Sequence, residues 1–182
     1  MIKFITLLVF LILIIAGFSW VNFNMETLPP ADIALNTVIK KTAEELKRKY
    51  QVSLIGIGGG GSNNEISMSA ISFQLAHTMS QEKCRKVILD CAQQFLKEIN
   101  GDSQLASYLS VRPFGYKNIK VIIFISHPDC SSVLHPEISV VSLANGVVQY
   151  ATVNPENTYE YKSVVRETYE EALKKVQSSD NL

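Results

Sequence analysis

An apolar run near the N-terminus constrains this chain more than any other feature. Residues 4–21 read FITLLVFLILIIAGFSWV, with only Thr6 and Ser19 as clearly polar interruptions. Such a helix has no polar face to present to water, so it belongs in lipid. At about 1.5 Å per residue it spans roughly 27 Å, near the thickness of a bilayer's hydrocarbon core. We therefore expect residues 4–21 to meet a membrane.

Two fates fit this run. Lys3 before the run, and the small residues Gly17 and Ser19 at its end, are typical of a secretory signal peptide cleaved after Ser19. The length of the run and Trp20 at its end favour an uncleaved transmembrane anchor. An anchor predicts a single-pass protein of the cell membrane with its C-terminal domain outside the cytoplasm. Cleavage predicts export to the periplasm or the extracellular space.

The remainder of the chain has the composition of an ordinary water-soluble domain. Lys+Arg and Asp+Glu each total 17 and the net charge is zero, so nothing points to a nucleic-acid partner. The mean hydropathy of the whole chain is +0.12. Without the first 21 residues it falls to about −0.2. We expect a leader over 1–21, a linker over 22–30 ending in Pro29-Pro30, one domain over 31–178 and a frayed tail over 179–182.

The cysteines do not form a disulfide framework. There are three, Cys84, Cys91 and Cys130, so they cannot all pair within one chain. Cys84 and Cys91 lie seven residues apart on an expected helix, about 10.5 Å along its axis and too far for a bridge. They share that helix's apolar face, where a thiol acts as a small hydrophobic side chain.

Hydrophobic periodicity predicts an alternation of helices and strands. We expect helices over 32–50, from Thr78 or Ser80 to 100, over 103–109, and from Thr158 onward with Tyr161, Val164 and Val165 facing inward. Strands are expected over 51–57, 64–75, 119–125, 137–144 and 147–153, with 119–125 buried on both faces. Asn145-Gly146 between two β-branched runs indicates a tight hairpin. This order predicts an α+β fold: a two-layer sandwich of about five mostly antiparallel strands, with three main helices packed on the sheet and a hydrophobic helix before it.

A glycine run follows the first expected strand. Residues 56–61 read GIGGGG and match G-x-G-x-x-G. A dinucleotide site needs a helix after those glycines, to bring its N-terminus to the phosphates. The following residues alternate like a strand instead, so we expect no nucleotide and no other cofactor. Gly58, Gly59, Gly60 and Gly61 are interpreted as the flexible tip of a hairpin that could contact a partner.

The strongest chemical constellation follows the strand over 119–125. His127, Asp129, Cys130 and His135 gather two histidines, a carboxylate and a thiol in one loop. A Cys–His pair could act as an activated nucleophile, and His, Cys and Asp are zinc ligands. The spacing matches no strong motif and two prolines mark a turn, so a plain connector is the competing interpretation. These four residues are the candidate catalytic residues.

A second loop could contact a partner. Arg112, Phe114, Tyr116 and Lys117 place two aromatic rings beside two cations in a turn, although an ordinary turn leading to the next strand explains them as well. We predict a membrane-anchored or exported domain that binds a protein or envelope partner without catalysis. The alternative is a thiol- or metal-dependent enzyme built on the loop from His127 to His135.

Overall fold

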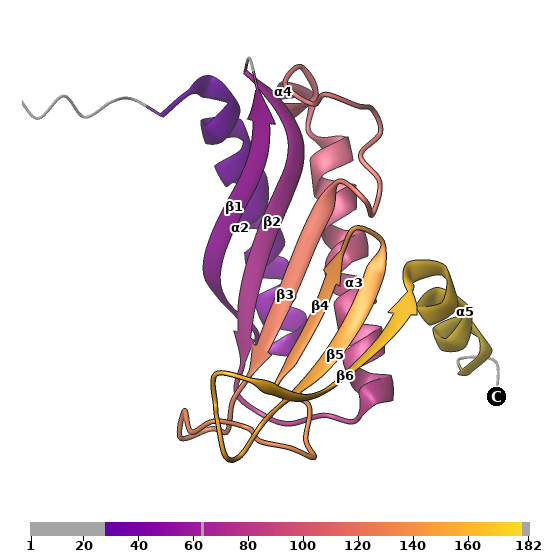
Figure 1. Ribbon diagram of the computed structural model, residues 1–182. Helices are drawn as coiled ribbons and strands as arrows, with labels where there is room; N and C mark the ends of the chain where they lie inside the picture. The colour runs from indigo at the N-terminus through magenta and orange to yellow at the C-terminus, as the bar shows by residue number, and fades with distance from the viewer. Residues whose placement is uncertain (1–27, 63, 180–182) are drawn as a thin grey trace, which may run out of the picture.

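The computed structural model describes residues 28–62 and 64–179 (Figure 1). The expected apolar helix over 4–21 and most of the linker over 22–30 lie outside the described residues, as do residues 180–182 of the tail. Within the described part of the chain, none of the helices has both the length and the apolar character needed to cross a membrane.

The helices and strands follow one another as a helix, a hairpin, two helices, four strands and a last helix. In chain order they are α2 (Pro30–Tyr50), β1 (Ser53–Ser62), β2 (Glu65–Leu75), α3 (Gln81–Gly101), α4 (Ser103–Ala106), β3 (Ile119–Ile125), β4 (Val140–Ala144), β5 (Val147–Val153), β6 (Tyr161–Thr168) and α5 (Tyr169–Ser179).

The strands form one six-stranded sheet in the order β1-β2-β3-β4-β5-β6. The β2–β3 pair is parallel, because α3 carries the chain back across the sheet, and the four other pairs are antiparallel. The predicted α+β class with a mostly antiparallel sheet is confirmed. The strand count differs somewhat from the predicted number of about five, since the described chain has six.

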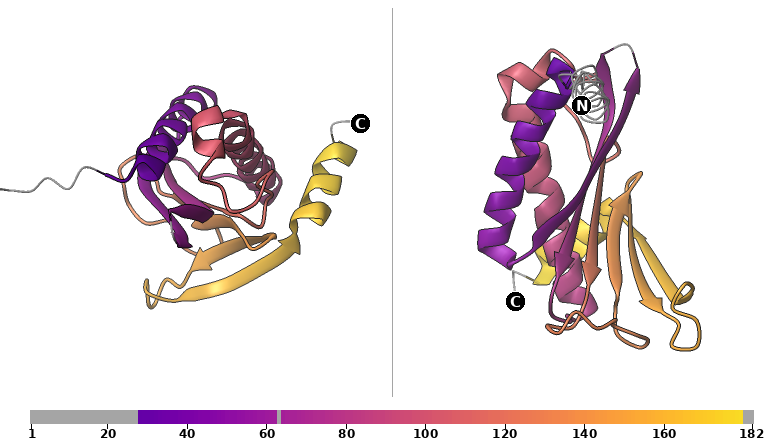
Figure 2. Two further views of the ribbon diagram at one scale, coloured as in Figure 1. Left: turned by 90° about the horizontal axis from the view of Figure 1, so that it is seen from above. Right: turned by 90° about the vertical axis from the view of Figure 1, so that its left-hand side faces the viewer.

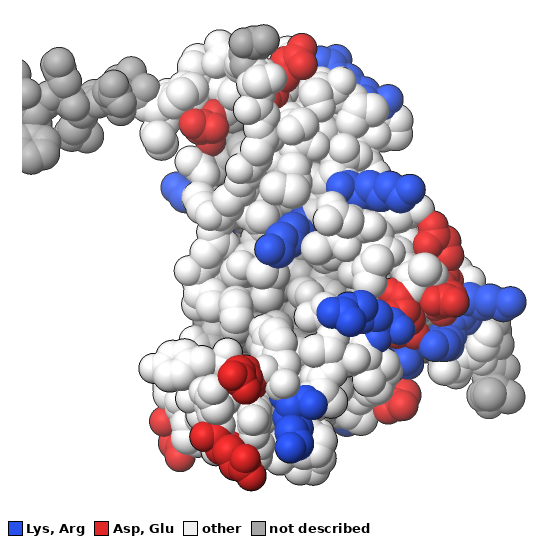
Figure 3. All heavy atoms as spheres, in the orientation of Figure 1, with Lys and Arg blue, Asp and Glu red and all other residues white. Residues whose placement is uncertain are grey.

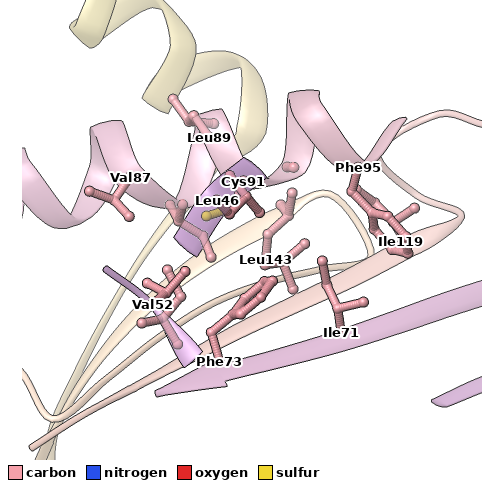
Figure 4. Close-up of a cluster of buried hydrophobic side chains, with 14 of the residues drawn as sticks. Leu46, Val52, Ile71, Phe73, Val87, Leu89, Cys91, Phe95, Ile119 and Leu143 are labelled. Carbon is pink, nitrogen blue, oxygen red and sulfur yellow. The ribbon is translucent and has the colours of Figure 1, made fainter. Parts of the chain in front are cut away.

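Helices α2 and α3 lie side by side on one face of the sheet, and α5 packs against α3 (Figures 1 and 2). The core fills the space between these helices and the sheet. Phe73 and Ile71 of β2 point toward Phe95 and Cys91 of α3 (Figure 4), and all four side chains are fully buried. Both buried cysteines, Cys84 and Cys91, lie on the apolar face of α3 as expected.

Within the described part of the chain, the opposite face of the sheet, which Figure 3 shows, carries no helix. Burial alternates along β3: Val121 and Ile123 face the helices, whereas Phe124 on the other face is 41% exposed. The prediction that this strand is buried on both faces is therefore wrong. The helices cover only one side, and the apolar character of Ile122 and Phe124 does not by itself bury them.

The glycine run is part of a strand. Gly58, Gly59 and Gly60 pair with Ala70, Ser69 and Met68 across the β1–β2 ladder, and Gly61 pairs with Ile66 after a register shift. The predicted flexible tip over Gly58–Gly61 is corrected to a strand that continues to Ser62. Pairing with β2 supplies the ladder hydrogen bonds, which outweigh the poor strand propensity of glycine.

The expected helix from Thr158 is also corrected. Residues 161–168 form the edge strand β6 against β5, and the helix begins only at Tyr169. Tyr161 and Val165, expected to face inward on a helix, are 51% and 48% exposed. These residues are aromatic or β-branched, which favours a strand wherever a neighbouring strand offers a free edge.

The remaining boundaries differ by a few residues. Asn145 and Gly146 have φ of 50° and 77°, as the predicted tight turn between β4 and β5 requires. Ser80 caps α3 by accepting a hydrogen bond from the backbone N–H of Lys83, 3.4 Å away. The strand expected from Glu137 begins at Val140, and the helix expected to reach Leu109 ends at Ala106.

Candidate binding groove

A groove lies between the N-terminal half of α2 and the far end of the β1–β2 hairpin. It encloses about 530 Å³, within the range of small-ligand and peptide sites. Its apolar wall is formed by Leu35 and Ile39 of α2 and by Ile66 of β2, all buried. Leu28 and Pro29, the first described residues, line its outer end.

The glycines of β1 create this groove. Residues directly opposite each other in an antiparallel pair project on the same face of the sheet. Gly59 is opposite Ser69 and Ile57 is opposite Ile71, so Gly59 lies on the face that α2 covers. A methyl group at Gly59 would meet the backbone oxygen of Met68 at 3.0 Å. Without side chains, the strand backbone forms the floor and α2 the wall.

The rim of the groove is polar. Asp32 and Asn36 stand on α2, and Asn64 and Glu65 on the hairpin. The two carboxylates are the only ionisable side chains among the described lining residues. The groove therefore offers an apolar wall, exposed backbone and an acidic rim, and its described residues supply no thiol, imidazole or hydroxyl–base pair for catalysis.

The loop from His127 to His135 is held by local hydrogen bonds. Oδ1 of Asp129 accepts from the backbone N–H and the hydroxyl of Ser131, at 2.9 and 2.6 Å. These bonds lower the pKa of Asp129. Cys130 is exposed and has φ of 66°, and its backbone N–H donates to the carbonyl of His127 over 3.0 Å. The left-handed backbone at Cys130 is part of a tight turn.

His135 is turned toward the sheet. Its Nδ1 lies 3.0 Å from the hydroxyl of Thr152, which lies 2.9 Å from the hydroxyl of Ser163. Among the described residues, no hydrogen bond joins the Cys130 thiol to either histidine. Nor does that part of the chain contain a group of three or more His, Cys, Asp or Glu side chains placed to hold a metal ion.

The turn over Arg112–Lys117 is packed into the domain. Phe114 is 3% exposed, and Asn100 of α3 bonds both its N–H and its carbonyl, at 2.8 and 3.0 Å. The ring of Tyr116 stacks on that of Tyr169, with centroids 4.6 Å apart. Arg112 and Lys117 are exposed. Of the four residues expected to contact a partner here, these two present their side chains most fully to solvent.

Sequence reasoning missed the α2 side of the groove. The helix expected over 32–50 contains Asp32 and Leu35, but its pattern gives neither residue a role in binding. The local sequence contains no signal that Asn36 and Asp32 border a groove. The one usable clue is the glycine run itself: four successive glycines in a strand leave a hollow wherever a helix crosses them.

Comparison of the chain with protein-family models, with curated proteins and with solved structures finds no match.

Proposed function

We propose that this chain is a non-catalytic binding domain that its apolar leader tethers to a membrane or directs out of the cytoplasm. The bound partner is an extended protein segment that occupies the groove between α2 and the glycine strand. The observation that carries this proposal is a groove of about 530 Å³ with a backbone floor, an apolar wall and a polar rim.

The chemistry of the groove selects its ligand. Leu35, Ile39 and Ile66 favour small apolar side chains on the bound segment. Asp32 and Glu65 favour N–H donors or a cationic residue beside them, and disfavour acidic segments. A glycine floor allows a partner backbone to approach closely, because no side chain stands between the two chains.

The position of the groove suits a tethered domain. Leu28 and Pro29 at its outer end belong to the linker over 22–30, so an anchor over 4–21 would hold the groove close to the membrane surface. A cleaved leader would instead release the groove with the exported domain. N-terminal sequencing of the mature protein distinguishes these two forms.

Site-specific photocrosslinking tests the groove as a binding site. A photoreactive phenylalanine at Asn36, in the full chain in its native cells, should give a discrete covalent adduct. The same group at Glu156, in an exposed loop, is the control and should give none. The substitution Glu65→Lys should weaken the Asn36 adduct several-fold without changing the folded content. Equal adducts at Asn36 and Glu156 would contradict a specific groove ligand.

A thiol-dependent enzyme centred on Cys130, with His127, Asp129 and His135 in the same loop, is the second candidate function. The observation that favours it is the exposure of the Cys130 thiol in the loop after β3. A catalytic thiol is activated by a neighbouring base and reacts faster than a free one. If Cys130 reacts with iodoacetamide at neutral pH no faster than a model thiol does, this alternative fails.

A further inference from the structure

Among the described residues, β1 forms an edge of the sheet, with no strand paired to its outer side. It stands at one end of the strand order, and the right-hand view of Figure 2 looks onto this edge. The strand Ser53–Ser62 contains no charged residue and no proline. Its outward backbone groups are a template for another strand.

The other edge of the sheet is protected. β6 carries Lys162 and Arg166, both exposed, and the buried carboxylate Glu167. Charged side chains on an edge strand discourage pairing with a further strand, because pairing would strip water from them. The contrast between the two edges singles out β1 as the one open to association.

The pattern of β1 is complementary to itself. The first half carries the large side chains Leu54, Ile55 and Ile57, and the second half, Gly58–Gly61, carries none. Ile55 and Ile57 are 52% and 55% exposed. When two such strands run antiparallel, the apolar half of each lies opposite the glycine half of the other. The isoleucine side chains of one copy then pack over the glycine backbone of the other copy, which has no side chains of its own.

The register shifts of the β1–β2 ladder indicate how two copies of β1 would be aligned. The β1–β2 ladder is interrupted between Leu54 and Gly56 and again between Gly60 and Gly61. The regular stretch between these shifts is Gly56–Gly60, whose centre is Gly58. A two-fold axis at Gly58 places Gly56 opposite Gly60 and Ile57 opposite Gly59 of the other copy.

We propose that two copies of this chain pair through β1, antiparallel about Gly58, so that two six-stranded sheets join into one. The partner is a second copy because its strand supplies the complementary pattern and no charge opposes the pairing. This surface is the outer edge of β1 in the plane of the sheet. The groove adjoins this edge, because residues 57–61 of the same strand line it on the face that α2 covers.

Disulfide trapping in the full chain tests the pairing. Cys130→Ser removes the exposed native thiol, and Gly58→Cys introduces one on the proposed axis. A Cβ at Gly58 would lie 3.7 Å from the Cβ of Ala70, an ordinary contact, so the variant should fold. Facing residues of paired strands lie about 4.5–5.5 Å apart between Cα atoms, within disulfide range. Mild oxidation should convert most of the protein to a covalent dimer. Val165→Cys on β6 is the matched control and should stay monomeric.

Mixing two single variants establishes the direction of pairing. Gly56→Cys and Gly60→Cys each have room for a side chain, with the nearest atoms at 3.5 and 3.9 Å. An antiparallel pair about Gly58 should link Gly56→Cys copies to Gly60→Cys copies at least tenfold more than either links to itself. Preferential self-linking of each variant would indicate parallel pairing and overturn the proposed register.

Sedimentation of the detergent-solubilised full chain tests association without a cross-link. The unmodified chain and Val165→Lys should be dimers, and Gly58→Lys should be a folded monomer by circular dichroism. Because Gly58→Lys leaves residues 4–21 unchanged, its loss of the dimer would be due to β1. A monomeric unmodified chain at about 100 µM, or a Gly58→Lys variant that stays dimeric, would overturn the proposal.

Discussion

Arg85 and Glu167 stand 82 residues apart in the chain, and Nε of Arg85 donates to Oε1 of Glu167 over 2.7 Å. The Glu167 side chain is 5% exposed. The hydroxyl of Tyr150 donates to the same oxygen at 2.5 Å, and Nζ of Lys175 to the other oxygen at 2.6 Å. This cluster joins α3 and β5 to β6 and α5, so it fastens the C-terminal part of the chain to the rest of the domain.

Replacing Glu167 by glutamine should destabilise the domain. The substitution leaves the largely buried Arg85 guanidinium without its counter-charge, and breaking a buried ion pair from one side costs about 3 kcal/mol. Chemical denaturation should show a clearly lower midpoint. Glu156→Gln, in an exposed loop, is the control and should leave the midpoint unchanged. Equal midpoints for the two variants would show that the cluster contributes little.

The same cluster predicts how stability depends on pH. Burial by itself would raise the pKa of Glu167, but the hydrogen bonds from Arg85, Lys175 and Tyr150 outweigh burial and hold this pKa below its ordinary value of 4.5. In acid the unfolded chain therefore binds this proton more readily than the folded chain does. The contribution of Glu167 is complete above about pH 5 and is lost as pH falls through the lowered pKa. Urea titrations at pH 7 and pH 4 should show a smaller acid loss for Glu167→Gln than for the native chain.

The three thiols should differ sharply in reactivity. Burial raises the pKa of Cys84 and of Cys91, each to about 12, so both stay protonated at neutral pH and shielded from reagents. Cys130 is exposed. Mass spectrometry after brief maleimide treatment should find one label on the native protein and three in denaturant. Native Cys130→Ser should take none, and labelling of either helix cysteine would indicate local opening of α3.

Two buried serines should respond oppositely to truncation. Ser69 is fully buried, and its hydroxyl has no hydrogen-bond partner among the described residues. The Ser139 hydroxyl donates to the Val133 carbonyl at 2.6 Å and accepts from the Val153 N–H at 3.1 Å. Ser69→Ala should leave the free energy of unfolding unchanged or raise it slightly, whereas Ser139→Ala should lower it by about 1–2 kcal/mol. The reverse order in denaturation would mean that the Ser69 hydroxyl binds a group of its own.

The glycines of β1 should not be interchangeable. A Cβ on Gly61 would lie 1.8 Å from the carbonyl oxygen of Glu65, so Gly61→Ala must displace the end of the hairpin. Gly58→Ala meets only the Cβ of Ala70 at 3.7 Å. We expect Gly61→Ala to cost more than about 1 kcal/mol and Gly58→Ala to be neutral within about 0.5 kcal/mol. Thermal unfolding of the two variants, compared with the native chain, provides the measurement.

Much of the fold could be predicted because its signals are local. The apolar positions of α3 recur at helical spacing, and that pattern is confirmed from Val87 to Ile99. Asn145-Gly146 needs positive φ at both residues, and the turn between β4 and β5 has it. An amphipathic face or a turn is a property of neighbouring residues, so its chemistry can be recognised before any tertiary contact is known.

The remaining features of the fold depend on strand pairing between segments far apart in the chain. Tyr161, Val164 and Val165 fit a helical stripe as well as a strand, and the free edge of β5 selected the strand. The glycine run by itself suggests a loop, but in the structure it pairs with β2 as a strand. Because α2 crosses this strand, the same arrangement creates the groove.

The sequence by itself determined the apolar run over 4–21, the α+β class and the amphipathic faces of the helices, because each depends on residues that are neighbours in the chain. Only the tertiary structure decided the sixth strand, the groove and the contact of Arg85 with Glu167. Those features depend on which distant segments contact each other. The free energy of such contacts is shared among residues far apart in the chain, so no local sequence pattern predicts them.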